Sequence, residues 1–116
     1  MSTEKITAEQ AVAWAIAHGA MPHLVDGSAV HTKEQALDAI GAALGFPDHY
    51  GRNLDALFDC LTDLSWLPDG QHVLVWAHHQ VLAARDWQAY HQVRSVLEEG
   101  AVSAPSRRLT VLFTTS

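Results

Sequence analysis

The sequence predicts an α/β domain in which helices pack on a three-stranded, mainly parallel sheet. Three short apolar segments, at residues 23–25, 72–76 and 109–113, are the strand candidates. Helical patterns separate them, so the strands need long crossover connections, and such connections join parallel strands. At 116 residues the chain can bury one hydrophobic core, and we expect a single folding unit.

The first two helices are each predicted by a capping box, in which a Thr side chain and the side chain three residues later bond each other's backbone N–H groups. Residues 7–10 form one such box before an N-terminal helix that Gly19 ends. Residues 32–35 form a second box before a helix whose apolar positions recur every three or four residues up to Gly45.

A third helix follows a loop at residues 46–51. In this loop Pro47 fixes one backbone angle, and Gly51 permits a positive φ. Asn53 is a good N-cap, and leucines at intervals of three or four then predict the buried side of the helix.

The second half of the chain predicts one more helix. It spans residues 87–99 and is expected to end at Gly100, because glycine commonly follows the last helical residue. Residues 77–85 show no clear pattern and are expected to be irregular.

The third helix carries three carboxylates on one face. Asp55, Asp59 and Asp63 stand four residues apart, so they point the same way, opposite or oblique to the leucines. Like charges at this spacing destabilise a helix, and Asp is a poor residue for a helix interior. Residues 48–69 hold five Asp and one Arg, a net charge of −4. The pattern indicates a surface for a basic partner, although it leaves open a helix face that is merely solvated.

Composition limits the other possibilities. The formal net charge of −6 argues against direct binding to nucleic acid, and no apolar run approaches the roughly 20 residues of a membrane-spanning helix. The single cysteine, Cys60, cannot form an internal disulfide, and the first five residues lack the pattern of a secretory signal. We therefore expect a cytoplasmic protein that binds neither a membrane nor a nucleic acid.

Residues 49–62 read His-Tyr-Gly-Arg-Asn-Leu-Asp-Ala-Leu-Phe-Asp-Cys-Leu-Thr and follow Leu-Gly-Phe-Pro at 44–47. This segment resembles, without a gap, the central segment of the barstar family, intracellular inhibitors of the bacterial ribonuclease barnase. The resemblance covers most of the chain from Met21 onward, and it implies a barstar-like fold with a three-stranded parallel sheet. Residues 1–20 would then be an N-terminal helical extension, and residues 21–116 the barstar-like domain.

In this family the helix and the loop before it plug the nuclease active site, where acidic side chains take the place of substrate phosphates. The resemblance implies that Asp59 is the deepest phosphate-mimicking carboxylate and that Asp55 is a second acidic contact. The other partner-binding positions expected on this basis are His49, Asn53, Leu54, Phe58, Thr62 and Asp63.

Several positions depart from the family pattern. His49 stands in place of a tyrosine, Phe58 in place of a tryptophan, and Asp63 in place of a glycine. A family glutamate of the fourth helix falls on Ser95, with Glu98 one turn away, and the sequence does not decide which of the two contributes. We therefore expect a barnase-like or related microbial ribonuclease as the partner, rather than barnase itself.

The sequence thus predicts an immunity protein that inhibits a basic secreted ribonuclease, is not an enzyme, and needs no cofactor or metal. We expect a monomer when free and a 1:1 complex with the nuclease. One alternative is an immunity protein for another toxin class, a deaminase or DNase, or an interaction module in a larger assembly built on the same scaffold. Another is a small metal-dependent hydrolase with Asp55 and Asp59 as ligands, aided by His49. Phe58 is either an interface anchor or a core aromatic, and Cys60 is expected to act as a small buried apolar side chain.

Overall fold

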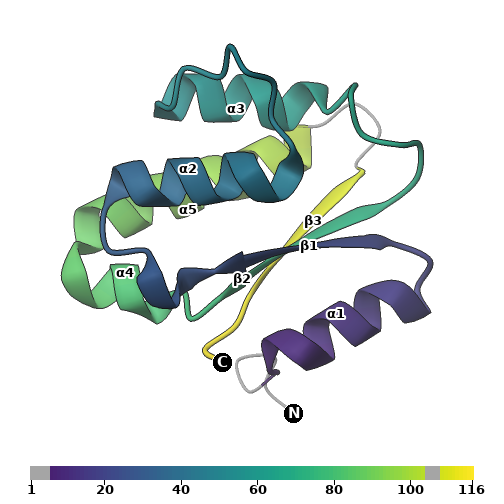
Figure 1. Ribbon diagram of the computed structural model, residues 1–116, viewed down its shortest axis with the longest axis horizontal. Helices are drawn as coiled ribbons and strands as arrows, with labels where there is room; N and C mark the ends of the chain where they lie inside the picture. Colours follow the sequence, from purple (N-terminus) through teal and green to yellow (C-terminus); the bar gives the residue numbers. More distant parts are fainter. Residues whose placement is uncertain (1–5, 104–107) are drawn as a thin grey trace.

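The chain forms a three-stranded parallel sheet with helices on both faces (Figure 1). The computed structural model describes residues 6–103 and 108–116. The strands are β1 (Met21–Asp26), β2 (His72–Ala77) and β3 (Leu109–Phe113), in the order β1-β2-β3. Both pairs are parallel, so the predicted α/β class with a three-stranded parallel sheet is confirmed.

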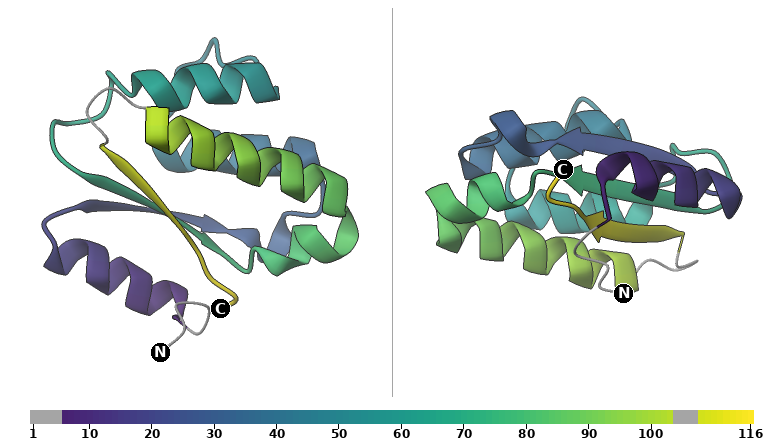
Figure 2. Two further views of the ribbon diagram at one scale, coloured as in Figure 1. Left: turned by 180° about the vertical axis from the view of Figure 1, so that it is seen from behind. Right: turned by 90° about the horizontal axis from the view of Figure 1, so that it is seen from below.

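The helices form layers around this sheet. They are α1 (Ala8–Ala17), α2 (Lys33–Leu44), α3 (Leu54–Asp63), α4 (Gln80–Arg85) and α5 (Trp87–Ser103), with the short 3-10 turn η2 (Gly27–Ala29). α1 packs on one face of β1 and β2, whereas α2 and α5 lie on the opposite face (Figures 1 and 2). α3 packs mainly against α5, on the side of the molecule away from α1.

The predicted helix starts are largely present. The Thr7 side chain accepts from the Gln10 N–H at 3.0 Å while the Gln10 side chain accepts from the Thr7 N–H at 2.9 Å, a complete capping box. At α2 only half of the box forms. Thr32 accepts from the Gln35 N–H, but the Gln35 side chain bonds the N–H of His31 instead of that of Thr32.

Two predictions for the second half of the chain are wrong. The stretch predicted to be irregular contains α4, which buries Leu82. Gly100 does not end the last helix, because α5 continues to Ser103. Gly100 is buried, and a Cβ added to it would lie 2.7 Å from Leu61 Cδ1 and 2.8 Å from Leu61 Cβ. The glycine therefore allows α3 and α5 to approach closely.

Two clusters of buried side chains hold these layers together. The larger fills the space between the sheet and the helices α2, α3 and α5, and the fully buried Trp76 is its largest member. The smaller lies under α1, where Ala11 and Ala15 pack on Val73 and Val75. α1 therefore covers a face of the sheet. Within the described residues, no helix combines the length and apolar composition that crossing a membrane requires.

Candidate functional site

The candidate site is the outer side of α3, and the helix is well fixed in the fold. The Asn53 side chain accepts from the Ala56 N–H at 2.8 Å and so caps the first turn, as predicted. Leu57 and Leu61 have no exposed surface, and they turn the helix toward the core. The helix ends at Leu64, which takes a left-handed φ of 49° and donates its N–H to the Cys60 carbonyl.

The three predicted carboxylates lie on the side of α3 that faces away from the core. Asp55, Asp59 and Asp63 are all exposed, whereas the leucines between them are buried. No Lys, Arg or His among residues 6–103 and 108–116 forms an ion pair with any of the three. The described part of the chain therefore leaves three like charges on one helix face without an ion-pair partner.

The loop before α3 is anchored to α2 by aromatic side chains. The Tyr50 ring packs on Gly41, where an added Cβ would lie 3.0 Å from Tyr50 Cε2, and the Tyr50 hydroxyl donates to the Leu37 carbonyl at 3.3 Å. Phe46 meets the Tyr50 ring edge-on at 4.8 Å between centroids. Burial raises the pKa of Tyr50 to about 12. The neighbouring His49 is exposed, so the loop presents it to solvent from a fixed base.

Gly51, which would permit a positive φ in this loop, does not adopt one. That conformation falls on Arg52, whose φ is 52°. Arg52 Nη1 binds Asp38 Oδ1 at 3.2 Å and thereby ties the loop to α2. Both side chains are exposed, so the ion pair positions the loop more than it stabilises the fold.

Phe58 lies at the seam between α3 and α5. It is half-buried, which places it between the two predicted roles of interface anchor and core aromatic. Together with Glu98, Glu99, Val102 and Ser103 it lines a hollow of about 450 Å³. Val102 is 74% exposed, so the hollow has an apolar wall open to solvent beside two carboxylates.

Sequence reasoning missed Val102 because it ended the last helix at Glu99, and it did not relate Glu99 to the partner-binding positions. A signal was present in the spacing of Val93, Leu97 and Gly100, which continue one helix face at intervals of four and three residues. All three residues are buried in α5. Reading Gly100 as part of that face would have extended the helix past the predicted end.

The remaining predicted contacts differ in their accessibility. The Thr62 hydroxyl donates to the carbonyls of Phe58 and Asp59, each at 3.1 Å, so in the free protein it serves its own helix. Leu54 packs partly against the core. On α5, Ser95 is half-buried, whereas Glu98 is exposed and accepts from Arg94 Nε at 2.9 Å.

Cys60 sits beside the acidic face but is not activated. Its thiol is half-buried, and its pKa is raised first by that burial and then by the charges of Asp59 and Asp63. The thiolate is therefore disfavoured, but the side chain is only half-buried and not fully buried as predicted. Among the described residues, no three His, Cys, Asp or Glu side chains are grouped closely enough to hold a metal ion.

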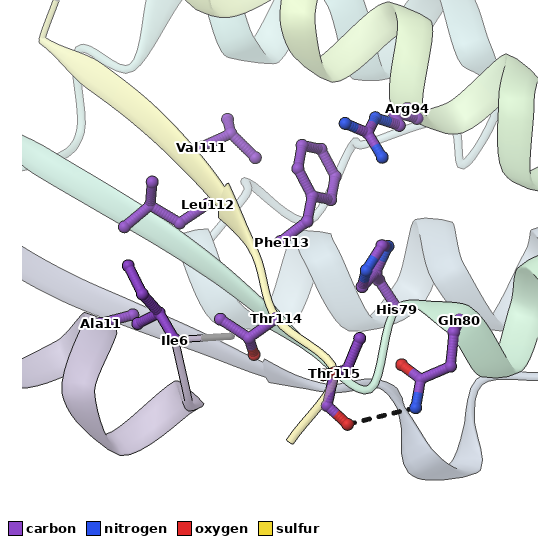
Figure 3. A pocket seen from close by; sticks show the side chains of 10 residues that line it. All are labelled: Ile6, Ala11, His79, Gln80, Arg94, Val111, Leu112, Phe113, Thr114 and Thr115. Atoms are coloured by element: carbon purple, nitrogen blue, oxygen red, sulfur yellow. Dashed lines mark hydrogen bonds between the residues drawn. The ribbon is translucent and has the colours of Figure 1, made fainter. Parts of the chain in front are cut away.

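A second hollow, of about 590 Å³, lies at β3 and away from the acidic face (Figure 3). On one side Arg94 stacks over the Phe113 ring at 4.1 Å and donates to the Tyr90 hydroxyl at 2.7 Å. His79 Nδ1 lies 2.6 Å from the same hydroxyl, and burial lowers the pKa of His79 with help from the Arg94 charge. These contacts join α5 to β3 and to the turn that follows β2.

The fold and the site define a small α/β domain that presents an acidic helix, with a hydrophobic seam beside it, on one side of a three-stranded parallel sheet. Comparison with known proteins names the family. The family described as Barstar (barnase inhibitor) matches residues 20–114, and the chain belongs to this family. The recognised resemblance and the fold that it implied are thus confirmed.

One curated relative supports the same assignment. It comes from Bacillus subtilis (strain 168) and carries the name "Putative ribonuclease inhibitor YrdF". The two sequences are 49% identical over 45 residues, which are 39% of this chain and 50% of the relative. The match therefore spans about half the length of that relative.

Proposed function

We propose that this chain inhibits a basic, secreted bacterial ribonuclease by laying α3 and the preceding loop across its active site. Asp59, in the middle of the helix, enters the site deepest, and Asp55 binds beside it. The further contacts in this proposal are His49, Asn53, Leu54, Phe58, Thr62 and Asp63. The protein acts in the cytoplasm as a monomer and forms a 1:1 complex with its target.

The observation that carries the proposal is the uncompensated acidic face of α3. Three exposed carboxylates share it, and no cation of the described chain pairs with them. A ribonuclease must stabilise the negative charge that develops during phosphoryl transfer, so its active site is positive and preorganised. A carboxylate on a rigid helix can enter such a site with little loss of conformational entropy. Family membership and the name of the relative support a nuclease as the partner.

Occlusion is sufficient for this function. The inhibitor has only to keep substrate phosphates out, so the proposal assigns no bond-breaking step to any of its residues. Charge complementarity would also speed the encounter with a basic enzyme, and this steering would weaken as salt is added. The chain's formal net charge of −6 has the sign that such steering needs.

The hollow beside Phe58 gives the proposed interface a second component. Its apolar wall and its two glutamates lie next to the acidic face, on α5. A partner side chain with an apolar stem and a cationic end would match both parts of this surface. Interface hot spots commonly combine an anchor of this kind with charged neighbours.

The test is a titration of the protein into a panel of small secreted bacterial ribonucleases, with RNA cleavage as the readout. We expect stoichiometric inhibition of at least one member, relieved by Asp59→Ala. The matched control is Glu9→Ala, which removes the same charge from α1 on the opposite face of the sheet. Failure to inhibit any ribonuclease would contradict the proposal and favour a deaminase or DNase as the target.

A further inference from the structure

Two histidines form a pair on the sheet, away from the acidic face. His23 on β1 and His72 on β2 lie on neighbouring strands, and His23 Nε2 is 3.0 Å from His72 Nδ1. The ring centroids are 5.2 Å apart. His72 is only 1% exposed, and His23 is half-buried.

The other nitrogen of each ring faces a backbone carbonyl. His23 Nδ1 lies 3.0 Å from the Ala43 oxygen, and His72 Nε2 lies 2.8 Å from the Pro68 oxygen. A carbonyl oxygen can only accept, so each of these outer nitrogens must carry a hydrogen. The two inner nitrogens face each other, so one of them must carry a hydrogen too, which is the third in this chain of bonds. Two neutral imidazoles hold only two such hydrogens, and the complete chain of bonds therefore carries one positive charge.

This chain of bonds holds both ends of the segment from residue 45 to residue 71, which contains the proposed binding loop and α3. Ala43 lies in the last turn of α2, immediately before the segment. Pro68 belongs to the turn that leads from α3 into β2. Trp66 reinforces the closure, since its Nε1 donates to the Leu44 carbonyl at 2.9 Å.

The surroundings oppose further charge on the pair. Arg108 Nη2 donates to the same Pro68 carbonyl at 2.7 Å, so a permanent cation shares an acceptor with His72. Within the described chain, the hydrogen-bond partners that α2 and the turn after α3 give the rings are backbone carbonyls. Asp69 forms no hydrogen bond or ion pair with either ring, and Asp38 of α2 pairs with Arg52 instead.

The surroundings of His23 also act on its pKa. Burial lowers the pKa of His23 from its ordinary value, the Ala43 carbonyl opposes this shift, and the charge of His72 adds to it. A second extra proton would place two charged rings against each other and turn both inner nitrogens into donors. The central hydrogen bond would then be lost.

We propose that His23 and His72 form an acid-sensitive clasp. With one shared extra proton the pair fastens both ends of segment 45–71, and a second proton forces the rings apart and releases them. The effect on the stability of the fold follows from the pair alone. The consequence for inhibition, a weaker inhibitor in acid, rests on the proposed function.

The test compares the unfolding equilibrium of the wild type with that of the double variant His23→Gln/His72→Gln between about pH 7.5 and about pH 5. Below the ordinary pKa of histidine the unfolded wild type binds two extra protons on these residues, whereas the fastened pair holds one, and the double variant binds none in either state. Each unit of acidification below about pH 6.5 should therefore raise the unfolding constant of the wild type about tenfold more than that of the double variant. Equal pH dependence of the two proteins would overturn the clasp.

His91→Gln is the matched control, because His91 is exposed on α5, and it should keep the wild-type pH dependence. Should the double variant fail to fold, nitrogen-15 NMR of the wild-type histidines decides the matter. We expect coupled titration of His23 and His72 with protonated outer nitrogens. Two rings that titrate independently near pH 6.5 would overturn the proposal.

Inhibition assays at the same pH values separate this inference from the proposed function. A wild type that loses inhibition in acid beside a His23→Gln/His72→Gln variant that does not would support both. Proton linkage in the unfolding data without inhibition of any ribonuclease would leave the clasp standing and refute the inhibitor role.

Discussion

Asp59→Ala should raise the stability of the protein while it weakens inhibition. Asp59 is exposed in the middle of α3, and it has no ion-pair partner among the described residues. Asp55 and Asp63 stand four residues on either side and share its face. The substitution therefore removes repulsion and a poor helix former, and it breaks no side-chain hydrogen bond or ion pair among the described residues.

The gain in stability can be worked from these contacts. Each like-charge pair at this spacing costs about 0.2–0.5 kcal/mol, and two such pairs disappear. Alanine is preferred over aspartate in a helix interior by about 0.7 kcal/mol. The free energy of unfolding should rise by about 1 kcal/mol or slightly more, which raises Tm by about 4–8 °C in a domain of this size.

The loss of inhibition is expected to be larger than this gain. Truncating one partner of a buried, hydrogen-bonded charge pair costs about 2–5 kcal/mol of binding free energy. The barnase–barstar complex is itself one of the systems on which such costs were measured. The dissociation constant would therefore rise by a factor between about 30 and several thousand. The two effects of Asp59→Ala thus have opposite signs.

Urea unfolding at low salt and at about 1 M salt, together with the inhibition titration, measures both effects. At the higher salt the Debye length falls to about 3 Å, so the repulsive part of the stability gain should vanish and the helix-propensity part should remain. An Asp59→Ala protein that is less stable than the wild type, or that inhibits equally well, would refute the reasoning.

Three further predictions test the packing around the site. Gly100→Ala should lower the free energy of unfolding by about 1 kcal/mol, although alanine has the better helix propensity, because the added Cβ would collide with Leu61. Calorimetry that shows a more stable variant would contradict this close approach of α3 and α5. Stability should fall as the pH rises from 10 toward 12, because the unfolded chain ionises Tyr50 before the folded protein does, and Tyr50→Phe should lack this loss in alkaline unfolding curves. Ala15→Glu buries a charge under α1 against Val73 and should destabilise the protein by about 2 kcal/mol or more. It should leave 1:1 inhibition intact if residues 1–20 are an extension of a separate functional domain, and lost inhibition in the folded variant would contradict this.

Local patterns predicted most of the fold. The capping residues Thr7 and Asn53 start their helices where the sequence placed them, and Gly45 ends α2 in a left-handed conformation. The strand candidate at residues 109–113 matches β3. Such features depend on residues within a few positions of one another, so periodicity and capping chemistry report them directly.

The prediction failed where a residue serves a distant neighbour. Gly100 has the chemistry of a helix stop, yet it lies inside α5 because Leu61 needs the space of its missing side chain. Gly51 could adopt a positive φ at little cost, yet the positive φ falls on Arg52, whose side chain binds Asp38 on α2. In both cases packing between separate elements outweighed the local preference.

The sequence by itself determined the parallel α/β class, the capped helices and an acidic stripe on an amphipathic helix, because each is set by the spacing of nearby residues. Only the tertiary structure decided that Phe58 joins Glu99 and Val102 in one hollow, and that His23 meets His72 across a strand pair. The two histidines are 49 positions apart in the chain. Their contact depends on the register of β1 against β2, which no local pattern encodes.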